Sequence, residues 1–208
     1  MGKIVAALLL ALFLTGCAAP PEPAPASAPA PASPEAQVER MSSSMVESSS
    51  RPLPETEILA AYELAQRIYG WFDLAPLPAS GESTLLEGET CFRVDMEGVR
   101  SLEDLRTYLR GVFSQELTDR LLDGRTARIQ YRNAGGVLYV SGEARERDPG
   151  KGQARVETER VEEDLYYVNV TVDLLAEDGE TVVGLESWSF PYAFQEDRWV
   201  FTDFRLIY

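Results

Sequence analysis

The last quarter of the chain constrains the fold most strongly. Residues 155–208 contain three long runs, and in each of them apolar and polar side chains alternate. This period of two is typical of β-strands that bury one face. The first run presents Tyr166, Val168, Val170, Val172 and Leu174 on one face. An Asp-Gly turn within Glu177–Glu180 separates it from the second run, which indicates an antiparallel hairpin. Pro191 in the second run indicates a sheet edge or a bulge.

Residues 101–142 predict two short helices followed by a hairpin. Ser101 and Asp104 have the spacing of a capping box, and leucines then recur at intervals of three and four residues. Ser114 is placed to cap a second short helix. Two strand-like runs flank the turn at 133–136, so we expect the helix pair to lead directly into the sheet.

Residues 55–72 predict the first helix, because their apolar side chains repeat with helical spacing. The helix ends in Tyr69, Trp71 and Phe72, which either fill the core under the sheet or form a ligand-stacking site. We interpret residues 73–89 as a loop from their Pro, Gly and Ser content and residues 89–96 as a strand. The fold class expected is α+β, with two or three N-terminal helices packed on one face of a curved antiparallel sheet of five or six strands.

The N-terminus predicts a lipoprotein signal peptide over residues 1–16. Lys3 precedes the short apolar run 4–14, which ends in a Leu-Thr-Gly-Cys tetrapeptide similar to a bacterial lipobox. This resemblance implies cleavage before Cys17 and acylation of that residue, which would anchor the protein to a lipid bilayer on the outer side of the membrane. The alternative is an ordinary signal peptide with a chance cysteine near its end.

Residues 17–54 predict a disordered tether rather than a domain. Seven prolines alternate with alanines between Pro20 and Pro34, and a Ser-rich segment follows. At about 3.1 Å per residue, the 35 residues from Pro20 to Pro54 could extend up to ~100 Å from the lipid surface. We expect residues 55–208 to form a single α+β domain that is large enough to be stable without disulfides.

The composition removes most kinds of catalysis. The chain has no histidine, and Lys151 is the only lysine left once the signal peptide is removed. Catalytic triads that use His and His-ligated metals are therefore excluded, and the sequence contains no phosphate-binding Gly motif. Paired carboxylates remain possible, but where acids are this abundant a pair of them is more often solvated surface. Cys91 is the only other cysteine, and we expect a small buried apolar side chain rather than a nucleophile. We predict no enzymatic activity, no catalytic residues, no metal site and no cofactor.

The formal net charge is −15, and it becomes −16 when Lys3 leaves with the signal peptide. Such a surface repels nucleic acid and attracts cationic proteins, although it also serves solubility alone. The acids are concentrated in two stretches, 157–164 and 177–180. The candidate binding surface includes Glu162, Glu163, Asp164, Glu177 and Asp178.

Three segments together resemble the IseA-type DL-endopeptidase inhibitors. They are Tyr-Gly-Trp-Phe at 69–72, the helical segment 105–122, and Gly-Gly-Val-Leu-Tyr-Val-Ser-Gly at 135–142. The resemblance implies an extracytoplasmic protein, not an enzyme, that blocks cysteine peptidases of the cell wall. The same resemblance adds four aromatic residues to the candidate binding surface: Tyr69, Trp71, Phe72 and Tyr139. The expected partner is a cell-wall hydrolase or another cationic envelope protein. The tether and lipobox depart from the simple secreted form of that family.

The order of elements also resembles nuclear-transport-factor-2-like domains, which hold a small ligand between helices and sheet. This alternative requires an open cavity lined by residues such as Tyr62, Tyr69, Trp188 and Tyr192. A binding protein would instead have a filled interior and exposed apolar side chains beside acidic loops.

Overall fold

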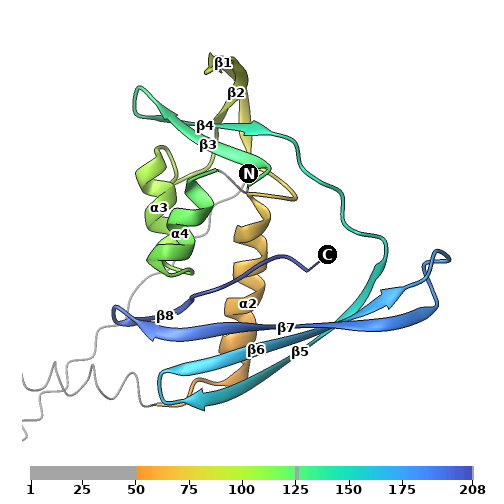
Figure 1. Ribbon diagram of the computed structural model, residues 1–208. Coiled ribbons are helices and arrows are strands. Elements are labelled where there is room, and N and C mark those ends of the chain that lie inside the picture. Colours follow the sequence, from red (N-terminus) through yellow and green to blue (C-terminus); the bar gives the residue numbers. More distant parts are fainter. Residues whose placement is uncertain (1–50, 125–126, 208) are drawn as a thin grey trace, which may run out of the picture.

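The computed structural model describes residues 51–124 and 127–207. The predicted signal peptide, Cys17 and the tether up to residue 50 lie outside these ranges. The described residues form three helices and eight strands in two antiparallel sheets (Figure 1). The helices are α2 (Glu55–Gly70), α3 (Leu102–Arg110) and α4 (Gln115–Leu122). The strands are β1 (Ala79–Leu86), β2 (Glu89–Val94), β3 (Ile129–Ala134), β4 (Val137–Gly142), β5 (Lys151–Glu162), β6 (Leu165–Leu175), β7 (Val182–Gln195) and β8 (Arg198–Phe201).

The α+β class is confirmed, but the expectation of one sheet with five or six strands is wrong. The first sheet has the order β1-β2-β4-β3 and the second has the order β5-β6-β7-β8. They are separate because the connection 143–150 lies outside both sheets and joins β4 to β5 across one side of the molecule (Figure 1). This connection is rich in charge and lacks apolar alternation, so it has no buried face with which to continue either sheet.

The interpretation of residues 73–89 as a loop is wrong in its second half, where β1 forms. β1 pairs antiparallel with β2 through a turn in which Glu87 and Gly88 both have positive φ. Most of β1 is exposed, so its sequence shows little of the apolar alternation that would indicate a strand. Its conformation depends instead on backbone pairing with β2.

The helix starts agree with the capping residues in the sequence. The Ser101 hydroxyl accepts from the Asp104 N–H, and Asp104 accepts from the Ser101 N–H, which completes the capping box of α3. The Ser114 hydroxyl accepts from the Leu117 N–H at the start of α4. Both short helices are therefore confirmed. Their buried leucines face the core, as the spacing predicts.

The two hairpin turns predicted from sequence are also confirmed. Gly135 and Gly136 both have positive φ between β3 and β4, which is the backbone that a two-residue primed turn requires. Residues 176–181 connect β6 to β7, closed by a hydrogen bond from the Ala176 N–H to the Thr181 carbonyl. In β6 the even-numbered residues from Tyr166 to Val172 are buried, in agreement with the predicted face.

Helix α2 runs from the second sheet to the first, with α3 and α4 together on one side of it (Figure 1). At its end, the Phe72 carbonyl accepts from the N–H of Ile129, the first residue of β3. The turn between α3 and α4 is held to the second sheet, because Phe201 in β8 bonds to both Val112 and Ser114. One core cluster contains side chains from all three helices and both sheets. The helices thus hold two separate sheets around one core.

Candidate binding surface

The aromatic end of α2 is mostly core. Phe72 is 2% exposed and packs edge-to-face on Tyr131, with the ring centroids 5.1 Å apart. Tyr69 is partly buried against Phe113 and Phe204. Burial, and then the negative charge of Asp73, raise the pKa of the Tyr69 hydroxyl. Phe72 and Tyr69 thus both contribute to the core at the end of α2.

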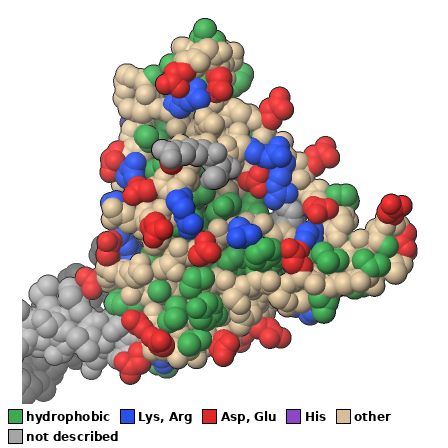
Figure 2. All heavy atoms as spheres, in the orientation of Figure 1, with side chains coloured by type: hydrophobic (Ala, Val, Ile, Leu, Met, Phe, Trp, Pro, Cys, Tyr) green, Lys and Arg blue, Asp and Glu red, His purple; other side chains and the backbone are tan. Residues whose placement is uncertain are grey.

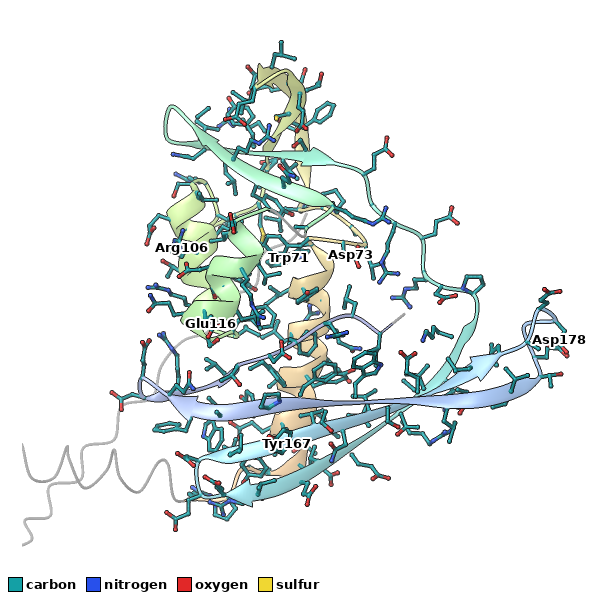
Figure 3. All side chains as sticks on the ribbon, in the orientation of Figure 1. Trp71, Asp73, Arg106, Glu116, Tyr167 and Asp178 are labelled. Atoms are coloured by element: carbon teal, nitrogen blue, oxygen red, sulfur yellow. The ribbon has the colours of Figure 1, made fainter. Side chains whose placement is uncertain are left out.

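Trp71 is partly buried, like Tyr69, and its ring contacts an exposed side chain of α3. Its ring packs on that of Tyr108 in α3, with the centroids 5.4 Å apart, and the Tyr108 side chain is exposed. Trp71 also lines a shallow cleft of about 370 Å³ beside the end of α2, together with Gly70, Leu74 and Arg147. Figure 3 shows Trp71 close to Asp73, at the point where α2 meets the connection between the sheets.

Asp73 holds that connection in place. Its carboxylate accepts from Arg145 Nε at 2.6 Å, and its carbonyl accepts from the Arg145 N–H at 2.9 Å. Arg128 lies 3.9 Å from the other carboxylate oxygen. Sequence reasoning missed this group, because no local pattern relates residues that are 72 positions apart in the chain.

Tyr139 lies elsewhere, on the outer face of the first sheet. In β4 the neighbouring Leu138 and Val140 face the core, so Tyr139 points to the opposite face. Its cross-strand neighbours are Arg93 in β2 and Arg132 in β3. The structure does not bring Tyr139 together with the aromatic end of α2.

The two groups of predicted acids lie at opposite ends of β6. Glu162 ends β5, Glu163 and Asp164 form the turn before β6, Glu177 and Asp178 lie in the turn after it, and all five are exposed. β6 has 11 residues, so at ~3.3 Å per residue the two turns are roughly 35 Å apart. The nine predicted surface residues therefore occupy four separate places.

The second acidic turn lies at the end of an arm, which we define as residues 174–185 of the β6–β7 hairpin. The arm extends beyond the rest of the molecule (Figure 1), and Asp178 lies at its tip (Figure 3). Its side chains Val182, Val183 and Leu185 are 52%, 65% and 60% exposed. Figure 2 shows hydrophobic side chains along the arm and acidic ones at its end. Sequence reasoning marked the acids but missed these apolar neighbours.

The geometry of the tip depends on Asp178. Its carboxylate accepts hydrogen bonds from the Thr181 hydroxyl and from the N–H groups of Glu180 and Thr181. These bonds favour the ionised form and lower the pKa of Asp178 to about 2. Asp178 is therefore negatively charged at neutral pH.

The space between helices and second sheet is filled by side chains. Phe204, from the segment after β8, contacts five aromatic rings there, with centroid distances from 4.7 to 5.8 Å. Tyr62 and Tyr192 are buried in the same core, and Tyr69 and Trp188 pack against it. A cleft next to Phe113, between α4 and the β7–β8 turn, has a volume of about 270 Å³.

The single cysteine of the described residues belongs to the core. Cys91 is fully buried, as predicted, and its thiol lies 3.6 Å from the carbonyl oxygen of Glu89. Across residues 51–124 and 127–207, no group of three or more acidic or thiol side chains is placed to hold a metal ion. No helix in those ranges has the length and hydrophobicity to cross a bilayer.

Comparison of the chain with models of protein families and with curated proteins finds no match.

Proposed function

We propose that the protein is a lipid-anchored binding protein of the bacterial cell envelope that binds and restrains a cationic peptidoglycan hydrolase. One observation supports binding above the alternatives: the interior is filled with aromatic side chains, whereas the arm exposes Val183 and Leu185 beside an acidic turn. Exposed apolar side chains next to charge are typical of protein interaction sites. In this proposal the domain has no catalytic role.

The negative charge of the domain would attract the partner before the two proteins touch. Most acids are exposed, and together they produce a negative potential that raises the encounter rate with a cationic partner. The apolar arm would then supply buried area in the complex. Acylated Cys17 and the tether would keep the domain on the outer side of the membrane, at the distance of the wall. A hydrolase bound there would be kept from its substrate.

The test is capture from the native envelope by the detergent-solubilised full chain, followed by a peptidoglycan-hydrolysis assay on what is bound. We expect a hydrolase whose activity falls as the chain is added, and an association rate that falls with salt as the Debye length shortens below about 8 Å. A hydrolase that is captured but keeps full activity would reduce the role to that of a scaffold. Capture of no wall protein would contradict the proposal.

The small-ligand alternative makes a different prediction. A carrier would co-purify with a molecule held between the helices and the second sheet, which native mass spectrometry would detect as an added mass. Tyr62 and Tyr192 occupy that space in the structure, with 3% and 7% of their surface exposed. A bound ligand would therefore have to displace packed rings.

A further inference from the structure

Strand β7 is longer than its neighbour β8, so part of its edge is open. β7 has 14 residues, and β8 pairs with four of them, Tyr192–Gln195. The other ten, 182–191, lie along β6 on one side, with Val183 unpaired, and on the other side no strand of the described residues lies beside them. The open part of the β7 edge ends at Pro191, whose carbonyl accepts a hydrogen bond from the Thr202 N–H at 3.1 Å.

The direction of this bond identifies the unpaired backbone groups. The Pro191 carbonyl points to the β8 side, and alternate residues of an antiparallel strand point the same way. The N–H and C=O groups of Leu185, Ser187 and Ser189 therefore point to the open side. Within residues 51–124 and 127–207, no backbone hydrogen bond reaches them from that side. All three residues are exposed.

This edge has a bulge at Val183 and Pro191 at its end, but between them it is less protected than the other long edge of the sheet. β5 has bulges near both ends, and six of its twelve residues are charged: Lys151, Arg155, Glu157, Glu159, Arg160 and Glu162. Charges and bulges on an edge strand discourage pairing with another chain. The open half of β7, residues 182–190, has one charged residue, Glu186, which is paired with Lys151. β7 is thus a long edge that is open to an added strand.

Side-chain sites lie on both faces of the open edge. On the inner face is a cleft of about 230 Å³, whose lining includes Lys151, Glu186, Trp188 and Arg205. The guanidinium of Arg205 lies over the Trp188 ring, 4.3 Å from its centroid. On the outer face Leu185 is 60% exposed. Alternate side chains of an added strand would enter the cleft or lie against Leu185, which is how strand addition becomes selective.

The charges at the ends of the edge determine the kind of partner. Glu177, Asp178 and Glu180 lie at the arm tip, and no Lys or Arg of the described residues forms an ion pair with them. Glu196 and Asp197 lie farther away, in the turn beyond the stretch of β7 that β8 covers, and Glu196 is paired with Arg198 at 2.8 Å. A strand that docks on the open edge is therefore favoured by basic residues, above all at its end beside the arm tip.

The same charges oppose a second copy of this chain. Symmetric antiparallel pairing of two β7 edges about Ser187 would bring Glu177 and Asp178 of one copy toward Glu196 and Asp197 of the other. Like charges so close together destabilise a strand pair. The net charge of −15 on each chain adds to this repulsion.

We infer that the open edge of β7 is the docking site for an extended segment of the partner protein, with a small or apolar centre and Lys or Arg at the end beside the arm tip, which pairs with Leu185, Ser187 and Ser189 as a fifth strand of the second sheet. The choice of a cationic partner rests on the proposed function. The assignment of the unpaired backbone groups of β7 as a strand-docking site does not depend on the proposed function.

The test uses the full chain and a fluorescent ten-residue peptide in which Thr and Val alternate between two lysines at each end. Two control peptides have glutamates in place of the lysines, or N-methyl groups on the amides between them. Fluorescence anisotropy should show binding of the first peptide and at least about tenfold weaker binding of both controls. Equal binding of the N-methylated peptide, or no binding of the first, would overturn the inference.

Variants of the chain locate the site. Ser187→Pro removes the outward N–H and obstructs the edge, so affinity for the peptide should fall at least about tenfold, whereas Ser187→Ala should change it less than about twofold. Leu185→Lys repels the cationic peptide and leaves the backbone intact. If the proline variant does not fold, the affinity of Leu185→Lys for the peptide tests whether the peptide binds at this edge. Glu177→Gln with Glu180→Gln should weaken binding, and the matched Glu162→Gln with Glu163→Gln should not. Binding unaffected by Leu185→Lys and by the Glu177 and Glu180 changes would place the peptide elsewhere.

Two further results separate this inference from the proposed function. If Leu185→Lys captures an envelope hydrolase as well as the wild-type chain does, the proposed function stands and the edge site is wrong. If the chain captures no hydrolase but binds the peptide at the edge, the site stands and the proposed function fails. Sedimentation that shows a dimer abolished by Ser187→Pro would assign the edge to a second copy and overturn the inference.

Discussion

Tyr131 in β3 connects two segments that are distant in the sequence. Its hydroxyl donates to the Trp71 carbonyl at 2.9 Å and accepts from the Leu77 N–H at 2.9 Å. The ring is 6% exposed and packs on Phe72. Burial raises the pKa of this hydroxyl, so it remains protonated and able to donate across the physiological range. One side chain thus fixes the path of the chain after α2.

Tyr131→Phe should therefore destabilise the protein by about 1–3 kcal/mol, because the Trp71 carbonyl and the Leu77 N–H each lose a partner in a buried place. The ring contact with Phe72 is retained in this variant. Chemical denaturation measures the change. The matched control is Tyr167→Phe on β6, where the side chain is partly exposed and has no comparable pair of bonds (Figure 3), and its effect should be below about 0.5 kcal/mol. Equal effects of the two changes would contradict this account of Tyr131.

The lowered pKa of Asp178 predicts that the stability of the folded protein depends on pH. The pKa of Asp178 is lowered to about 2, against about 3.9 in an unfolded chain, so its charge stabilises the fold above pH 4 and the effect is lost as pH falls toward 2. Asp178→Asn should have a lower melting temperature than the wild type at pH 7, and the difference should disappear near pH 2. Thermal unfolding across this range measures it. Glu177→Gln in the same turn is the control, and a difference that persists at pH 2 would contradict the assignment.

At the scale of elements, Gly142 ends β4 in a conformation that other residues rarely adopt. Its φ is 101°, and a Cβ built there would lie 2.1 Å from the carbonyl oxygen of Arg128. Glycine lets the chain leave the first sheet directly beside β3, with which Gly142 pairs at Ile129. The connection 143–150 begins from this point.

Gly142→Ala should cost at least about 2 kcal/mol, because it adds both a strained backbone and a collision with main-chain atoms. Gly81→Ala in β1 is the matched control, since a Cβ there meets nothing within 4 Å, and it should stay within about 0.5 kcal/mol. Denaturant unfolding compares the two. A mild effect at Gly142 would mean that β3 and β4 can separate at little cost.

At the scale of the whole molecule, the lipobox predicts where the protein is found. Cys17→Ser should abolish acylation, so the protein should move from the membrane fraction to the soluble fraction without loss of the fold. Fractionation with immunodetection measures the distribution, and circular dichroism of the purified variant is the control for folding. Wild-type amounts of the variant in the membrane pellet would contradict anchoring through Cys17.

Local patterns predicted the parts of the fold whose cause is local. The capping box at Ser101 and Asp104 and the Gly135–Gly136 turn are formed by residues close in sequence, and each was found where expected. β1 was missed because its pairing with β2 involves the backbone and leaves little trace in side-chain pattern. The candidate surface was predicted in part: the acids are exposed, but Phe72 belongs to the core.

The sequence by itself determined the α+β class, the faces of the strands and helices, and the chemistry that a chain without histidine cannot perform, because these depend on composition and on periods of a few residues. Only the tertiary structure decided that the strands form two sheets, that the acidic turns lie at opposite ends of β6, and that β8 is too short to cover β7. Each of these depends on which distant backbone groups meet, and exposure of an edge depends on what the neighbouring strand leaves unpaired. No local pattern in the sequence contains that information.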